Sequence, residues 1–172
     1  ILSGIDNANQ EIVSLGTGAA STLVVVEFNN HRVRSYHVGD SMALVVGQRG
    51  KVHMQTVSHS PVGYAVESGI LDETEAMLHE ERHVVSNMLG MTDMRMELGP
   101  EVELAERDTV LLASDGLFDN LSVEEIIGQV RCGKLLDSAA KLAADTQLRM
   151  QTSDTTTPSK PDDLTFILMR RR

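Results

Sequence analysis

The fold of this chain is indicated by one stretch, Val110-Leu111-Leu112-Ala113-Ser114-Asp115-Gly116-Leu117-Phe118-Asp119-Asn120. Its first four residues form a short apolar run, which predicts a buried strand. The Asp-Gly pair then places a carboxylate where that strand leaves the core. Asp-Gly after a strand is also ordinary turn chemistry, because Gly tolerates positive φ and Asp hydrogen-bonds its own backbone. The stretch is therefore compatible with either a metal ligand or a plain turn at Asp115.

Two further acidic turns follow the same pattern. Asp162-Asp163 precedes a second apolar run, Leu164–Met169, and Asp40 lies in a bend between two strand segments. If the strands are neighbours in one sheet, these acids converge on one hard cation, for which carboxylate oxygens are suitable ligands. Asp40, Asp115 and Asp162 are therefore candidate metal ligands, although each turn taken alone is common.

The composition favours a single globular domain, residues 1–172, because 172 residues with 41% hydrophobic content can bury a sizeable core. A net charge of -10 argues against binding nucleic acid or an anionic membrane. The single cysteine, Cys132, excludes an internal disulfide and suits a reducing, cytoplasmic location. No apolar stretch approaches the roughly 20 residues of a membrane span, and no secretory leader is visible.

Strands are expected early and late in the chain, with helices between them. Apolar runs and alternation predict strands over Thr22–Phe28, Arg32–His37, Ser41–Val46, Val110–Ala113 and Leu164–Met169. Helical spacing predicts helices over Ile5–Val13, Gly63–Glu81 with a break at Gly69, Ser122–Val130 and Lys134–Met150. Ser122 and Glu125 form a capping-box signature. Thr152–Lys160 is expected to be a mobile loop and Arg170–Arg172 a solvated tail. This order predicts an α+β domain of layered sheet and helices.

Two other motifs suggest different chemistry. His79-Glu80-Glu81-Arg82-His83 fits the H-E-x-x-H pattern of zinc proteases, but Val84–Asn87 looks extended, so a solvated, charged helix end is the alternative. The glycine-rich segment Gly16–Ser21 could suggest a phosphate loop. Because it leads into a strand rather than a helix, it is expected to be a hairpin entry.

Taken in order, the acidic motifs resemble those of the PPM-class (type 2C) metal-dependent protein serine/threonine phosphatases. The resemblance rests on Gly39-Asp40-Ser41 with Ala43, Ser114–Asp119 and Asp162–Thr165, in that order and at these separations. Further segments similar to the family are Gly18–Thr22, His59 with Gly69-Ile70, and Arg82–Met91. The resemblance covers essentially the whole chain and implies a layered β-sandwich flanked by helices.

By this resemblance, Asp115, Asp162 and Asp40 are ligands of a metal centre that holds Mg²⁺ or Mn²⁺, with two or more ions in the complete domain. Gly116 and Asp163 are supporting residues, and Asp163 stands where the family usually has Asn. The implied function is hydrolysis of phosphoserine and phosphothreonine in a phosphoprotein substrate by a metal-activated water. Both ions accept the same oxygen ligands, so the choice between them stays open.

One motif of the family has no counterpart before Gly16. The family's D-G-H-G-G-type motif supplies the bridging aspartate and a histidine proposed as general acid, so the catalytic residues are expected upstream of this chain. The chain then corresponds to the C-terminal two-thirds or so of such a domain, and residues 1–172 alone are expected to hold metal weakly and to hydrolyse little. Met42 replaces the usual Arg of the family, which is expected to alter a surface contact rather than the metal site.

Two alternative functions stay open, one from these departures and one from the H-E-x-x-H match. A pseudophosphatase-like interaction or regulatory module without turnover is suggested by the missing motif, Met42 and Asp163, whereas the acids at positions 40, 115 and 162 argue against it. A zinc protease is the other alternative. Cys132 lies in a helical region without a phosphate-cradling loop, which argues against a cysteine-based phosphatase. The sequence identifies neither the substrate protein nor the oligomeric state.

Overall fold

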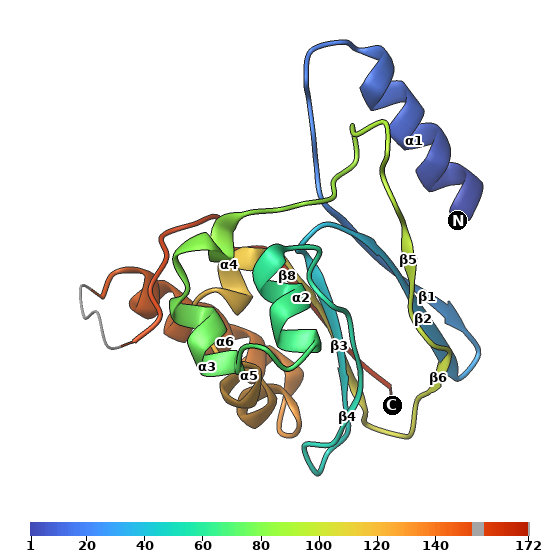
Figure 1. Ribbon diagram of the computed structural model, residues 1–172. Coiled ribbons are helices and arrows are strands. Elements are labelled where there is room, and N and C mark those ends of the chain that lie inside the picture. Colours follow the sequence, from blue (N-terminus) through green and yellow to red (C-terminus); the bar gives the residue numbers. More distant parts are fainter. Residues whose placement is uncertain (153–156, 172) are drawn as a thin grey trace.

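The computed structural model describes residues 1–152 and 157–171, and the strands in this part of the chain form two antiparallel sheets (Figure 1). The first sheet is centred on β2 (Arg32–Val38), which pairs with β1 (Leu23–Asn29), β5 (Glu97–Leu98) and β6 (Val102–Glu103). The second sheet has the order β4 (Val52–Gln55), β3 (Met42–Val46), β7 (Thr109–Ala113) and β8 (Phe166–Arg170).

Helices cover the outer faces of both sheets. They are α1 (Leu2–Ser14), α2 (Pro61–Glu67), α3 (Glu73–Leu78), the 3₁₀ helix η1 (Glu80–His83), α4 (Asp115–Phe118), α5 (Val123–Val130) and α6 (Leu135–Met150). Ile5 of α1 packs on Tyr36 and Val38 of the first sheet, whereas α5 and α6 lie on the second sheet (Figure 1). The molecule therefore has four layers, helix, sheet, sheet and helices, which confirms the expected α+β layered β-sandwich flanked by helices.

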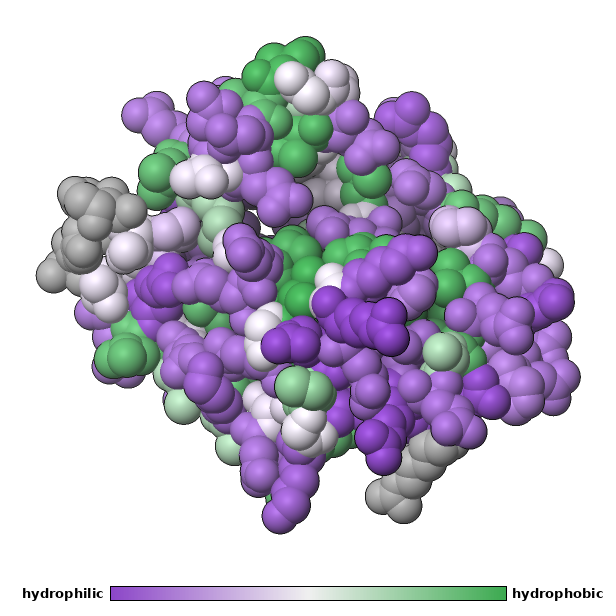
Figure 2. All heavy atoms as spheres, turned by 90° about the horizontal axis from the view of Figure 1, so that it is seen from below, coloured by the Kyte–Doolittle hydropathy of each residue, from purple (hydrophilic) through white to green (hydrophobic). Residues whose placement is uncertain are grey.

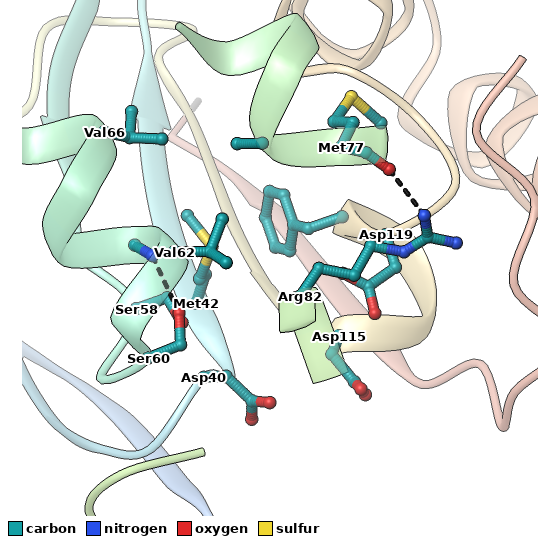
Figure 3. Close-up of a pocket in the computed structure, with 13 residues that line it drawn as sticks. Asp40, Met42, Ser58, Ser60, Val62, Val66, Met77, Arg82, Asp115 and Asp119 are labelled. Carbon is teal, nitrogen blue, oxygen red and sulfur yellow. Dashed lines mark hydrogen bonds between the residues drawn. The ribbon is translucent and has the colours of Figure 1, made fainter. Parts of the chain in front are cut away.

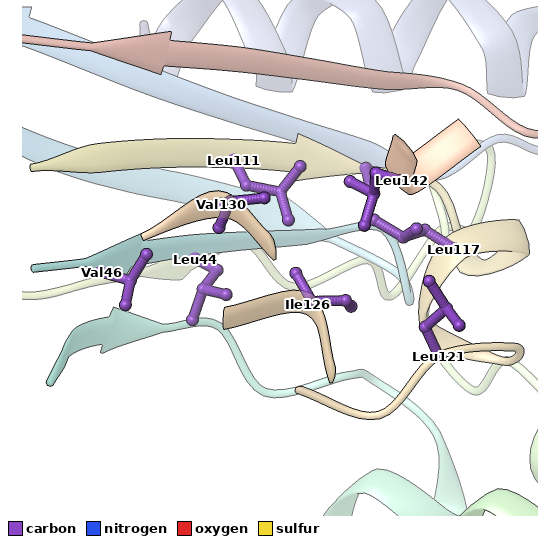
Figure 4. Close-up of a cluster of buried hydrophobic side chains, with 9 residues drawn as sticks. Leu44, Val46, Leu111, Leu117, Leu121, Ile126, Val130 and Leu142 are labelled. Atoms are coloured by element: carbon purple, nitrogen blue, oxygen red, sulfur yellow. The ribbon is translucent and has the colours of Figure 1, made fainter. Parts of the chain in front are cut away.

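Alternate residues of β3 and β7 face the two different cores. Val45 and Val110 pack between the sheets, in a cluster with Val33 of β2. Leu44 and Leu111 point the other way, into the core under α5 and α6 (Figure 4). The central strands of the second sheet are covered on both faces, and they are therefore apolar over Met42–Val46 and Val110–Ala113, with Thr109 as the one polar residue at the start of β7.

The bend at Gly39–Ser41 carries the chain from one sheet to the other, since β2 belongs to the first sheet and β3 to the second. Gly39 has φ +102°, and a Cβ at this position would lie 2.4 Å from Cγ2 of Thr22. Only glycine meets both requirements without strain. The sharp bend leaves Asp40 at the rim of the sandwich.

Several local expectations are confirmed. α2 ends before Gly69, which has φ +72°, and α3 begins after it. The capping box of α5 is present: the Ser122 side chain accepts from the Glu125 amide, and the Glu125 side chain accepts from the Ser122 amide. Gly16–Ser21 leads into β1 and its hairpin, with no helix following it.

The expected solvated tail, Arg170–Arg172, is wrong for its first two residues. Arg170 is the last residue of β8, and its guanidinium donates to Thr109 Oγ1 at 2.9 Å and to the carbonyl of Val130 at the end of α5. Arg171 donates to the carbonyl of Leu104. These carbonyls lie at loop and helix ends and need donors, which is why the arginines are held. Arg172 lies outside the described residues.

The face seen in Figure 2 is mainly hydrophilic, around a smaller hydrophobic area. Large exposed apolar side chains include Leu136 of α6 and Ile167 of β8. Within residues 1–152 and 157–171, no helix has the length and apolar character required to cross a membrane.

Candidate metal centre

Three acidic turns meet at one rim of the sandwich. Asp40 lies in the bend before β3, Asp115 is the first residue of α4, and Asp162 precedes β8. Met42 of β3 and Phe166 of β8 both pair with Ala113, the last residue of β7. The three turns therefore lie at the same end of the second sheet, as expected for acids on neighbouring strands. Figure 3 shows Asp40 and Asp115 on opposite sides of one pocket.

A lysine lies among these acids. Lys160 Nζ is 2.9 Å from Asp115 Oδ2, 2.6 Å from Asp119 Oδ2 and 3.2 Å from Asp162 Oδ2. The side chain of Lys160 is 22% exposed and that of Asp119 is 16% exposed. Three carboxylates thus surround one positive charge in a partly desolvated position, where electrostatic interactions are stronger than in water.

The pKa values of these groups reflect burial and crowding of like charge. Burial, and then the neighbouring charge of Asp115, raise the pKa of Asp40 to about 6. Burial also raises the pKa of Asp119, although the Lys160 ammonium partly offsets this. For Lys160, burial lowers the pKa, but the bonds and charges of Asp119 and Asp115 outweigh burial and leave that pKa raised. Lys160 is therefore a stable cation in this setting.

The arrangement fits a hard divalent cation. The Lys160 contacts show that oxygens of Asp115, Asp119 and Asp162 already converge on a single cation, and all of these ligands are carboxylates. Mg²⁺ and Mn²⁺ prefer such oxygen ligands. A cavity of about 130 Å³ adjoins the acids and is lined by Asp40, Asp115 and Asp119 together with residues of α2, α3 and η1.

The two residues expected to support the centre, Gly116 and Asp163, contact each other beside the turn that carries Asp115. Gly116 is buried, and a Cβ there would lie 2.3 Å from the Asp163 carbonyl oxygen. That oxygen also accepts a hydrogen bond from Ser114 Oγ at 3.3 Å. Asp163 has an exposed side chain, so the contact it makes with this turn is through its backbone.

The expectation for Met42 is wrong in its location. Met42 is half-buried and lines the same cavity as Asp40 and Asp115, because it is the first residue of β3, directly after the bend that carries Asp40. The residue that replaces the family's Arg therefore lies next to the candidate acids.

Two members of the centre, Asp119 and Lys160, were not among the residues predicted from sequence. Asp119 lies four residues after Asp115, a spacing that puts both carboxylates on one face of a helical turn, and this signal was present in the motif. Lys160 belongs to the segment Thr152–Lys160, expected to be mobile. Residues 153–156 lie outside the described residues, but Lys160 itself is held, because its backbone amide and carbonyl both bond the buried Asn120 side chain.

A second group of potential ligands lies next to the bend that carries Asp40, since the Gly39 amide bonds one of its histidines, His59. Within residues 1–152 and 157–171, His37, His59 and Glu97 bring ligand atoms within 4.8 Å of one another. However, His59 Nδ1 accepts from the Gly39 amide at 3.1 Å and from Asn87 Nδ2 at 2.7 Å. In neutral imidazole the proton is then on Nε2, which donates to Glu97 Oε2 at 3.3 Å instead of binding a metal. Burial, and then His37, lower the pKa of His59, which favours this neutral form.

The H-E-x-x-H motif does not form a zinc site. α3 ends at Leu78, and His79 has extended backbone angles, φ -69° and ψ 138°. The chain continues as the 3₁₀ helix η1, and His79 Nδ1 accepts from the Glu81 amide. The two histidines therefore do not share one face of a continuous α-helix, which the zinc motif requires.

Comparison with known proteins identifies the family of this chain. The family model described as stage II sporulation protein E (SpoIIE) matches residues 1–172. The chain belongs to this PPM-type family. Protein phosphatase PhpP of Streptococcus pneumoniae is 32% identical over 127 residues, covering 69% of this chain and 50% of the relative. The PPM-type chain therefore spans half the length of that curated relative.

Solved structures show the same fold. The serine/threonine phosphatase Stp1 from Staphylococcus aureus superposes with a TM-score of 0.84 at 26% identity, covering 99% of this PPM-type chain and 66% of that one. The catalytic domain of the serine/threonine phosphatase PstP, solved in complex with two manganese ions, superposes with a TM-score of 0.72 at 24% identity, covering 93% and 65% of the two chains.

Proposed function

We propose that the natural protein containing this chain is a metal-dependent protein serine/threonine phosphatase. The observation that carries the proposal is the convergence of Asp115, Asp119 and Asp162 on one cation, within 3.2 Å in each case, with Asp40 at the same rim. Membership of the PPM-type family and the likeness to phosphatases of known structure support it. The chain spans half the length of its relative PhpP, and the phosphatase activity is therefore proposed for the whole natural protein.

The residues of this chain would hold Mg²⁺ or Mn²⁺ through carboxylate oxygens. Asp115, Asp119 and Asp162 form the first ligand set, and Asp40 faces it from the bend before β3. When bound, such ions lower the pKa of a coordinated water and offset the charge on phosphoryl oxygens. Gly116 and Asp163 keep α4 close to the strand entry, so that the acids of the two turns stay together. The two manganese ions in PstP support a centre of more than one ion.

The proposal takes residues 1–172 as part of a single PPM-type domain whose remaining ligands and general acid lie upstream. It also takes a phosphoprotein as substrate and the cytoplasm as location. The free cysteine, Cys132, is exposed, which is compatible with a reducing compartment.

The test is Mn²⁺-dependent phosphate release from a phosphothreonine peptide by the longest natural polypeptide that contains residues 1–172. Asp115→Asn keeps the size of the side chain but removes a ligand charge, so we expect a loss of at least about 100-fold in kcat/KM, the scale of lost electrostatic stabilisation. Asp93→Asn, an exposed aspartate of a turn, is the matched control and should leave activity unchanged. Folded, metal-loaded protein without any release would favour the interaction module instead.

A further inference from the structure

The position of Lys160 is fixed by its backbone. Its amide donates to Asn120 Oδ1 at 2.8 Å, and its carbonyl accepts from Asn120 Nδ2 at 2.9 Å. Asn120 is fully buried and also donates to the carbonyl of Gly116, inside the turn that carries Asp115. One residue earlier, the Ser159 carbonyl accepts from Arg82 Nη2 at 3.0 Å. The lysine is therefore attached to the same turn whose acids it contacts.

The Lys160 ammonium uses the oxygens that a divalent ion would need. Oδ2 atoms of Asp115, Asp119 and Asp162 all face Nζ, at 2.9, 2.6 and 3.2 Å. An ammonium and a dication cannot share this position, because both need the same lone pairs and repel each other. The butyl chain of lysine is flexible, so the head group can move away while the backbone stays bonded to Asn120.

We propose that Lys160 is the resident counter-cation of the acid centre, and that a divalent ion binds by displacing its ammonium. Lys160 then determines the affinity of the centre for metal and stabilises the metal-free protein. This inference rests on the proposed function, because it concerns the metal of the same site.

Two opposite effects follow from removing the charge. Without Lys160, the three carboxylates repel one another in the metal-free protein, which lowers its stability. The same repulsion favours a dication, because metal binding no longer has to break the charged hydrogen bonds of Lys160 to Asp115 and Asp119 and its ion pair with Asp162. Metal affinity should therefore rise while metal-free stability falls.

The experiment is a calorimetric Mn²⁺ titration of the longest natural polypeptide containing residues 1–172, together with thermal unfolding in EDTA and in Mn²⁺. For Lys160→Met we expect a Kd lower by about tenfold or more, since each 1.4 kcal/mol of released competition is a factor of about ten. The unfolding midpoint should be lower than wild type in EDTA, with a larger increase on adding Mn²⁺. Lys160→Arg retains the charge and should not tighten binding.

Lys141→Met is the matched control, because Lys141 also pairs with an acid, Asp145, but 62% of its side chain is exposed and it lies away from the centre. It should leave the Kd unchanged. If Lys160→Met does not fold without metal, Lys160→Gln, which keeps a hydrogen-bond donor, takes its place in the same titration. If wild type and the neutral variants bind Mn²⁺ with equal affinity, the inference about Lys160 is wrong, whereas the proposed function still stands. If neither wild type nor the Lys160 variants bind Mn²⁺, the proposed function is wrong as well.

Discussion

Gly116 shows how a single missing methyl group shapes the acid centre. A Cβ at this position would lie 2.3 Å from the Asp163 carbonyl oxygen and 3.1 Å from the carbonyl carbon, so backbone has to move to admit it. We expect Gly116→Ala to destabilise the protein by roughly 1–3 kcal/mol, the usual cost of overpacking. It should also weaken Mn²⁺ binding, because the displaced segment carries Asp162. Denaturant unfolding and a Mn²⁺ titration measure the two effects.

Gly128 provides the control for this substitution. It lies inside α5, and a Cβ there would meet nothing within 4 Å. Gly128→Ala is expected to stabilise the protein by about 0.5–1 kcal/mol through helix propensity and to leave Mn²⁺ affinity unchanged. Equal effects of the two substitutions would show that the close approach at Gly116 has no role in the centre.

The acids of the centre were predictable from sequence, whereas Lys160 was not. Asp40, Asp115 and Asp162 each stand beside a strand end with turn residues around them, which is a local signal. The position of Lys160 depends instead on the pairing of β7 with β8 and on its bonds to Asn120, 40 residues away in sequence. No local pattern in its polar segment indicates such a contact, so only the structure identifies it.

At the scale of elements, α6 packs on the second sheet through one buried face. Leu142 is fully buried in the core beneath the helix, whereas Leu148, also on α6, is 67% exposed. Leu142→Ala is expected to lower the free energy of unfolding by about 2–5 kcal/mol, through lost burial and the cavity left behind. Leu148→Ala should change it by no more than about 0.5 kcal/mol. Denaturant unfolding of both variants checks this, and similar losses would mean that α6 does not pack as described.

The longer elements were predictable because they have strong local signals. The capping box at Ser122 and Glu125 fixes the start of α5, and helical spacing identifies α6 within one residue of its bounds. β5 and β6 were missed, since each has only two paired residues, too few for any periodic pattern. Their pairing with β2 is set by the packing of the whole sheet rather than by their own sequence.

At the scale of the whole molecule, the assignment of strands to sheets was the least predictable feature. β2 and β3 are consecutive and separated only by Gly39–Ser41, a spacing that also suits neighbours in one sheet. They lie in different sheets because the positive φ of Gly39 and its contact with Thr22 turn the chain sharply at that point. A family resemblance, rather than periodicity, implied the sandwich.

The two sheets are expected to unfold as one unit, because they share the cluster that contains Val33, Val45 and Val110. Val110 is 1% exposed on β7, so Val110→Ala should lower the free energy of unfolding by about 1–3 kcal/mol. Hydrogen exchange should then show reduced protection in peptides from β2 as well as from β7, although the substitution lies in only one sheet. Val52→Ala, at a position 38% exposed at the start of β4, is the control and should leave both peptides unchanged. Loss of protection confined to β7 would mean that the sheets open independently, and that the rim holding Asp40 and Asp115 is not one rigid support.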